Sequence, residues 1–295
     1  MQSLKENINS FNREYGKVFF VVICGVGIIL TSIFIYVTST PQKLKVSFLD
    51  IGQGDAILIQ TPSGQKLLID GGPTNIILDR IYSQISFFDH TMDVMVSTHP
   101  DADHVTGLIP ILEKFNVNKI ITSSVPGDTG IFKELESSIQ NENSETHIGN
   151  AGDILDFHDG VTATILHPYN DEKFKDTNEG SVTLLLKYGD ETFLLDGDLP
   201  TTKEPLILTS LLPHNITVYK AGHHGSKYSS GEQLLTYIKP EYSVISAGKD
   251  NKYGHPNLEA MERLQKYSKE IISTIDRGTI SFITDGKIIE VNTTK

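Results

Sequence analysis

The sequence predicts a layered α/β domain of about 250 residues behind one N-terminal membrane helix. An uncharged apolar run occupies residues 18–37, and short β-branched runs alternate with helical stretches from residue 45 onward. The part of the chain from 45 to 295 contains no fixed-period repeat, low-complexity tract or linker. The chain has 295 residues, of which 38% are hydrophobic and one is cysteine, which excludes a disordered protein and a disulfide-stapled mini-domain.

The apolar run at 18–37 has the length of a membrane span. As a helix it would be about 30 Å long, close to the hydrocarbon thickness of a bilayer. A buried core helix would carry a polar stripe, and a signal peptide usually has a shorter apolar region. We therefore expect an uncleaved anchor at 18–37, after a tail (1–17) and before a linker (38–44), although the small residues after Val37 leave cleavage open.

The orientation of this anchor is weakly encoded. Basic residues lie on both sides of the apolar run, at Lys5, Arg13, Lys17, Lys43 and Lys45, so the positive-inside signal is small. A short N-terminal tail in the cytoplasm would place the domain 45–295 outside the cell. We expect a single-pass protein of the cell membrane with an extracellular domain. A protein partner cannot be predicted from the sequence.

The domain begins with three strands at hairpin spacing, at 46–51, 56–61 and 66–72, separated by turns that contain glycine. The next elements in order are a helix at 75–85, a strand at 92–98, a helix at 105–115, a strand at 116–124 and a loop at 123–150 that we expect to border the cleft. Later strands are expected at 162–168, 181–189, 192–198, 216–222, 242–248 and 279–286, with helices at 203–211, 232–238 and 258–266.

The most informative segment is the turn after the strand at 92–98. Four metal-competent side chains lie within six residues there, namely His99, Asp101, Asp103 and His104. Imidazole and carboxylate together suit zinc, manganese or iron. An acidic turn with an aspartate capping the next helix is the alternative, but four such residues at this spacing favour a metal site.

This segment resembles the H-x-H-x-D-H signature of the metallo-β-lactamase family, in an H-x-D-x-D-H variant similar to the extracytoplasmic domain of ComEC-type competence proteins. Six further segments resemble that family in order along the chain. They are D-I-G-Q-G-D within 49–55, L-I-D-G-G at 68–72, N-x-x-S at 178–181, G-D-L within 195–199, H-H-G-S within 220–226 and S-x-G-x-x-N-x-Y-x-H-P at 246–256.

The resemblance implies an αββα sandwich with a site for one or two divalent ions, zinc or manganese, at the edge between two sheets. It implies that His99 and Asp101 hold the first ion and that Asp103 and His104 hold the second. Asp198 would bridge the two ions and His255 would complete the set. Asp101 and Asn178 stand where many zinc hydrolases have histidines, which shifts the first site towards manganese or magnesium and leaves a one-metal enzyme open.

The remaining site residues follow from the same resemblance. It implies catalytic roles for Asp103, His223, His224 and Lys220, substrate contacts from Asn178, Ser226, Lys227, Asn251 and Tyr253, and outer support from Asp70 and Asp55. Because adjacent residues at a strand end point to opposite sides, we expect one of the two histidines to face the site. A surface turn remains the alternative for this segment, a surface lysine for Lys220 and a turn-forming aspartate for Asp70.

These features predict a membrane-anchored hydrolase that cleaves phosphodiesters with a metal-activated water. Single-stranded DNA is the first candidate substrate by resemblance. From Val46 onward, however, the chain has 20 basic and 35 acidic residues, and a net charge of −15 opposes a tight grip on long nucleic acid. One alternative is therefore an envelope phosphodiesterase, such as a phosphorylcholine or teichoic acid esterase. The other is a non-catalytic, metal-stabilised binding protein of the envelope.

Overall fold

The computed structural model of the chain describes residues 15–32, 43–209 and 211–295. The first of these segments is a helix, Tyr15–Ser32, with a mean hydropathy of 1.9 and the length and composition to cross a membrane. It begins three residues before the predicted span. The predicted end of the span at Val37 and most of the predicted linker lie outside the described residues.

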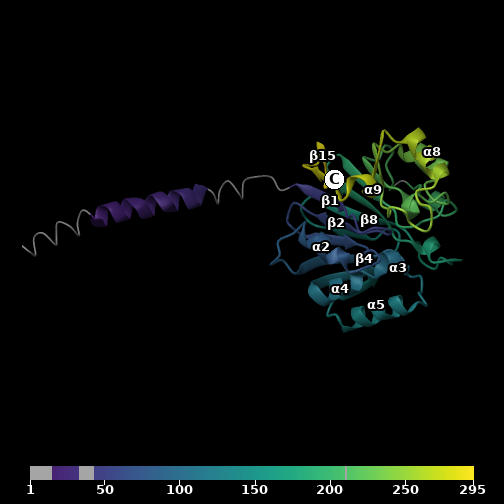
Figure 1. The fold of residues 1–295 in the computed structure, drawn as a ribbon, viewed down its shortest axis with the longest axis horizontal. Helices are drawn as coiled ribbons and strands as arrows, with labels where there is room; N and C mark the ends of the chain where they lie inside the picture. The colour runs from purple at the N-terminus through teal and green to yellow at the C-terminus, as the bar shows by residue number, and fades with distance from the viewer. Residues whose placement is uncertain (1–14, 33–42, 210) are drawn as a thin grey trace, which may run out of the picture. The chain divides into compact units, whose positions relative to one another are not determined.

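The domain that follows is an αββα sandwich, as predicted (Figure 1). One sheet has the order β15-β14-β1-β2-β3-β4-β5-β6 and the other the order β13-β12-β11-β10-β9-β8-β7. The strands of the first sheet are β1 (Leu44–Phe48), β2 (Ile57–Gln60), β3 (Lys66–Ile69), β4 (Thr91–Ser97), β5 (Asn116–Thr122), β6 (Glu145–Ile148), β14 (Ile280–Thr284) and β15 (Ile289–Thr293). Those of the second are β7 (Ile154–Asp156), β8 (Val161–His167), β9 (Thr183–Tyr188), β10 (Glu191–Leu195), β11 (Val218–Lys220), β12 (Tyr242–Ile245) and β13 (Glu270–Ser273).

Three apolar layers hold the sandwich together. The central layer packs the facing sides of the two sheets, including Phe48, Phe193 and Phe282. The second layer lies between the first sheet and its helices, α2 (Ile76–Tyr82), α3 (Ala102–Val105), α4 (Leu108–Lys114) and α5 (Gly130–Asn141). The third lies between the second sheet and α6 (Glu204–Ile207), α7 (Glu232–Ile238) and α8 (Leu258–Tyr267). The short helix α9 (Thr274–Arg277) follows β13.

Parallel strands bring the site residues to one edge. In the first sheet β3, β4 and β5 are parallel neighbours, and in the second β10, β11 and β12 are parallel neighbours. The carboxyl ends of parallel strands meet at the same edge of a sheet. The loops after β3, β4, β10, β11 and β12 are the ones that carry the predicted metal and catalytic residues.

The structure differs from the predicted elements at two places in the first half. The predicted helix at 105–115 is divided into α3 and α4 at Gly107, where a Cβ would lie 1.9 Å from the carbonyl oxygen of Gly71. The predicted loop at 123–150 contains α5 and the edge strand β6. The signal for α5 is the spacing of Phe132, Leu135 and Ile139, which places the three side chains on one helical face against the second apolar layer.

Candidate metal centre

The loop after β4 is fixed by Asp70, which follows β3. The Asp70 carboxylate accepts hydrogen bonds from the backbone and hydroxyl of Thr98, at 2.8 and 2.6 Å, and from Nδ1 of His104 at 2.7 Å. Nδ1 of His99 donates to the Thr98 hydroxyl at 3.0 Å. Both imidazoles are therefore fixed through Nδ1, which leaves Nε2 to face the centre, as outer partners do for metal-binding histidines.

The loop after β11 brings two adjacent histidines to the same place. His223 and His224 both adopt left-handed backbone conformations, with φ of 49° and 56°. Nε2 of His223 lies 3.5 Å and Nε2 of His224 lies 3.6 Å from Oδ2 of Asp198. The prediction that one of them faces the site is wrong, because two successive left-handed residues turn both side chains inward. Such strained non-glycine residues are concentrated at functional sites.

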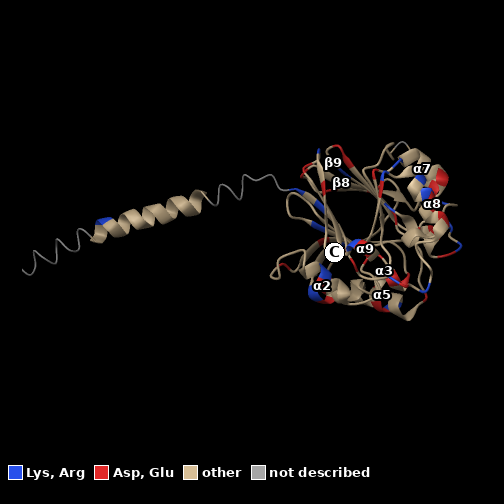
Figure 2. Cartoon of the chain, turned by 45° about the horizontal axis from the view of Figure 1, so that its top comes forward, with Lys and Arg blue, Asp and Glu red and all other residues tan. Residues whose placement is uncertain are grey.

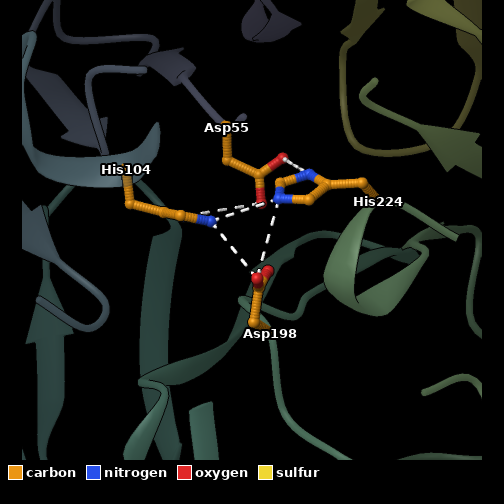
Figure 3. A group of neighbouring side chains, drawn as sticks. All are labelled: Asp55, His104, Asp198 and His224. Atoms are coloured by element: carbon orange, nitrogen blue, oxygen red, sulfur yellow. Dashed lines mark hydrogen bonds and ion pairs between the residues drawn. The ribbon is translucent and has the colours of Figure 1, made fainter. Parts of the chain in front are cut away.

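Asp198 lies at the centre of the arrangement. Its Oδ2 is 3.7 Å from Nε2 of His99 and 3.4 Å from Nε2 of His104, in addition to the two histidines above. Figure 3 shows the carboxylate facing His104 and His224. Within the described residues, Oδ1 of Asp198 and Nε2 of His99 are buried without a hydrogen-bond partner. Four Nε2 atoms converge on one buried carboxylate, and two of the buried polar atoms in this group have no hydrogen-bond partner, an arrangement that fits a divalent metal.

Asp55 and Asp103 approach His224 from opposite sides. One ligand atom from each of Asp55, His104, Asp198 and His224 lies within 4.8 Å of the others. However, Oδ1 of Asp55 faces Nδ1 of His224 at 3.3 Å, and that nitrogen also donates to the backbone oxygen of Ser246 at 3.0 Å. Oδ2 of Asp103 instead faces Nε2 of His224 at 3.5 Å. The chemistry therefore favours Asp103 as the ligand and Asp55 as the outer partner.

Lys220 does not face the cleft. It is 1% exposed, and its ammonium group contacts Oδ2 of Asp55 at 2.5 Å and the backbone oxygens of Gly197 and Ala221 at 3.3 and 3.2 Å. These three partners use all three ammonium protons. This corrects the predicted catalytic role, because a lysine so enclosed cannot contact a substrate phosphate. It neutralises Asp55 beneath the site.

Buried carboxylates and imidazoles in the centre shift one another's pKa values. Burial disfavours charge, but the carboxylates of Asp198 and Asp55 outweigh it and raise the pKa of His224 to about 9. The pKa of His104 is raised well above its ordinary value against burial by Asp198 and Asp70. Burial, together with the neighbouring His104, lowers the pKa of His99 to about 4. The buried carboxylates are therefore stabilised by positive charge at the imidazoles, which either protons or metal ions can supply.

The other predicted ligands lie further out. Oδ2 of Asp101 is 3.8 Å from Nε2 of His99, and the Asp101 side chain is 40% exposed. The amide oxygen of Asn178 is buried without a partner among the described residues. His255 lies outside the group of four, with its ring centroid 5.3 Å from that of His223, so its place in the metal set stays a prediction.

Four of the five predicted substrate residues lie in the loops after β11 and β12, and the fifth is Asn178. Tyr253 is half exposed and borders a cleft of about 610 Å³ that Gln53, Asp101, Asp103, Thr129, Asn251 and Lys252 also line. A larger hollow of about 760 Å³ lies beside Ser124 and Glu172, so the chemistry and not the size identifies the first as the candidate substrate cleft. Lys227 is exposed, with Nζ 5.2 Å from the Tyr228 ring centre.

Two predicted substrate residues are engaged in holding these loops. The Asn251 amide donates to the backbone oxygens of Gly248 and His255 and accepts from the backbone nitrogens of Tyr253 and His255. Ser226 is buried and its hydroxyl accepts from the backbone of Tyr228. Asn251 therefore positions the loop that carries Tyr253 and His255, and Ser226 positions the turn that carries Lys227 and Tyr228.

Sequence reasoning missed several residues that orient the centre. Thr98 links Asp70 to His99, Ser181 accepts the backbone N–H of Asp198 at 3.1 Å, and the Ser246 carbonyl orients His224. Gly54 also belongs here, because a Cβ at this residue would lie 2.1 Å from the carbonyl oxygen of Asp103. Each of these residues lies inside or next to a recognised motif, and this position in the sequence was the only indication that they support the site.

Comparisons with known proteins agree with this geometry. Residues 49–249 match the family described as the metallo-beta-lactamase superfamily. The chain is 27% identical over 271 residues to ComE operon protein 3 of Bacillus subtilis, covering 85% of this chain and 34% of the relative. It is 30% identical over 284 residues to Recombination protein 2 of Haemophilus influenzae, covering 93% of this chain and 34% of the relative. The chain thus spans about a third of the length of these curated relatives.

A solved structure supports the fold alone. YhfI, a metallo-beta-lactamase fold protein from Bacillus subtilis, superposes with a TM-score of 0.55 at 10% sequence identity. The match covers 82% of this chain and all of YhfI.

Proposed function

The chain belongs to the metallo-β-lactamase superfamily, and from that premise we propose that it is a membrane-anchored, metal-dependent phosphodiesterase. The observation that carries the proposal is the convergence of four imidazole Nε2 atoms, each 3.4–3.7 Å from Oδ2 of Asp198. When bound, divalent ions at such a site polarise the phosphoryl oxygens and lower the pKa of a water molecule. Zinc and manganese both suit the donor set.

The chain's own residues divide the remaining work. His104, His224, Asp103 and Asp198 would hold one ion, and His99, Asp101 and Asp198 would hold a second. His223 lies on the solvent side of this group with 27% of its side chain exposed. From there its Nε2 donates a proton to the leaving oxygen of the substrate, as a general acid. Tyr253 and Lys227 contact the substrate at the rim.

Two substrate classes remain in competition. The relatives named ComE operon protein 3 and Competence protein ComA make short or single-stranded DNA the first candidate. Basic residues are interspersed with acidic ones over the domain in Figure 2, and the net charge of −15 beyond residue 45 weakens attraction to a long phosphate backbone. This charge favours an envelope polymer as the second candidate, for which a phosphorylcholine or teichoic acid ester is the model substrate.

The helix Tyr15–Ser32 supports the anchoring part of the proposal. We place the domain outside the cell, since the basic residues near the helix do not oppose this orientation. Protease treatment of intact cells tests the placement. Digestion of the domain is the expected result, and full protection of the domain until the membrane is opened would reject it.

Adjacent histidines give a matched test of the catalytic roles. The full-length protein in detergent is stripped of metal, reloaded with Mn²⁺ or Zn²⁺, and assayed on bis(p-nitrophenyl) phosphate, a DNA oligonucleotide and p-nitrophenyl phosphorylcholine. We expect His224→Asn to lose both metal and turnover, and His223→Asn to keep its metal but lose turnover. If His223→Asn retains wild-type turnover, the general-acid assignment is wrong. If the loaded wild type cleaves none of these esters, the hydrolase proposal fails.

A further inference from the structure

The end of the sandwich opposite the metal centre presents an aromatic tip. Phe87 and Phe88 lie in the loop between α2 and β4 and are 67% and 88% exposed. The Phe87 ring packs 5.6 Å from that of Tyr82 and 5.8 Å from that of Phe88. Phe87 is therefore the base of the tip, and Phe88 projects from it into solvent.

The loop that carries this tip is held in place. Asp89 accepts a hydrogen bond from the backbone of Thr91 at 3.1 Å, and its carboxylate pairs with the ammonium group of Lys66 at 3.0 Å. The charge beside the tip is thus neutralised by an ion pair. A fixed loop that exposes two adjacent phenylalanines to water offers an apolar surface, and covering this surface is favourable.

The tip lies at the end of the sheet where the chain enters the domain. Lys45 in β1 pairs with Gln60 in β2, Gln60 pairs with Lys66 in β3, and Lys66 contacts Asp89 beside the tip. With about 4.8 Å between neighbouring strands, the start of β1 and the tip are roughly 15 Å apart.

A second exposed apolar residue lies on the other side of β1. Leu44 pairs with Thr284 of β14, and Ile288, which is 67% exposed, ends the turn from β14 to β15. The entry point of the domain therefore lies between Ile288 and the aromatic tip.

The metal centre lies at the far end of the same strands. β4 runs from Thr91 beside the tip to Ser97 beside His99, a length of about 23 Å for seven residues. The aromatic tip and the metal centre therefore face opposite directions along the strands.

We propose that Phe87 and Phe88 insert into the surface of the bilayer that holds the N-terminal helix, so that the metal centre points away from the membrane. This inference rests on the proposed anchoring. The ten residues 33–42 can span at most about 35 Å, a tether short enough to permit this end of the domain to touch the bilayer. Aromatic side chains are favoured at the membrane–water interface, and insertion of a neutralised tip does not require an anionic lipid.

The chain offers a clean probe, because it contains no tryptophan. Phe88→Trp in the full-length protein, reconstituted in phosphatidylcholine vesicles, places a single fluorophore at the tip. Leu258→Trp is the matched control, since Leu258 is 71% exposed and begins α8 beside the metal-centre loops. We expect phosphatidylcholine brominated near the interface to quench the emission of the Phe88→Trp variant by roughly half and to leave the control within about a tenth of its value.

The possible failures are distinguishable. If the protein does not float with the vesicles, the proposed membrane anchoring is wrong, and the proposed membrane contact of the tip is rejected as well. If the protein floats but Phe88→Trp emits as in water and is quenched no more than the control, only the membrane contact is wrong, and the tip is then free for a protein partner. Activity on bis(p-nitrophenyl) phosphate is measured on the same samples, so a failure of the hydrolase assignment is seen separately.

Discussion

The two sides of Asp198 differ in how firmly they are built. On one side His104 and His224 are buried, and their Nδ1 atoms are fixed by Asp70 and by the Ser246 carbonyl. On the other side His99 is buried, but its carboxylate neighbour Asp101 is 40% exposed. The inner side is prearranged for a metal ion, while the outer side opens onto the cleft. We infer that the inner position binds metal more tightly and that the outer one is adjusted by substrate.

Removing the shared ligand should have the largest effect on both sides. Asp198→Asn is expected to lower kcat/KM by about 10³-fold or more, because both ion positions lose the carboxylate between them. Metal content and steady-state kinetics measure the result. Asp196→Asn is the matched control, because Asp196 is a buried aspartate two residues away whose Oδ1 accepts a hydrogen bond from the Thr183 hydroxyl at 3.0 Å. Burial and the nearby Glu204 raise its pKa well above the ordinary value. Equal losses in the two variants would contradict the bridging role.

The second-largest effect is expected at the buried ion pair of Lys220 and Asp55, which lies beneath the inner side. Lys220→Met leaves the buried Asp55 carboxylate without its cation, and we expect the free energy of unfolding to fall by about 3–5 kcal/mol. Urea titrations of the variant and the wild type measure the loss. The double variant Lys220→Met/Asp55→Asn should recover part of it, since neither charge then remains buried alone. A single variant as stable as the wild type would show that the pair does not support the centre.

A carboxylate away from both sides separates global stability from metal binding. Burial raises the pKa of Glu204 to about 7, above the value of 4.5 from which it is raised, so the folded state holds this proton more tightly than the unfolded state. Its stabilisation is complete below about pH 4.5 and is lost as the pH rises to about 7, a change of about 3 kcal/mol. Glu204→Gln should flatten the stability profile over this range in metal-free protein, and an unchanged slope would exclude Glu204 as its source.

The outer side should show the smallest effect. Asp101→Asn is expected to lower the affinity for the outer ion by about 10-fold, while the inner ion is retained. Isothermal titration calorimetry with Mn²⁺ measures the two affinities separately. Loss of both ions in Asp101→Asn would mean that the sides are not independent and would remove the distinction drawn above.

The same contrast explains how much of the site the sequence could predict. His99, Asp101, Asp103 and His104 lie within one six-residue turn, so their spacing alone indicated a metal site. Asp198 lies almost a hundred residues later, and only a family resemblance located it. The sandwich itself followed from the alternation of strands and helices and from the ordered motifs.

The remaining features depend on three-dimensional packing. No spacing rule predicts that His223 and His224 adopt successive left-handed conformations, which turn both rings towards Asp198. The burial of Lys220 against Asp55 depends on a contact between residues that lie 165 positions apart in the sequence. The helix α5 was missed because its apolar face is narrow and lies within a polar stretch.

The most direct test of the central claim compares metal content and turnover in one preparation series. Wild type, His104→Ala and the tip variant Phe88→Ser are purified in parallel, analysed by inductively coupled plasma mass spectrometry, and assayed on bis(p-nitrophenyl) phosphate with Mn²⁺. We predict metal and turnover in wild type and Phe88→Ser, and neither in His104→Ala. If His104→Ala keeps the metal content and turnover of the wild type, the residues around Asp198 are not the metal centre of this protein.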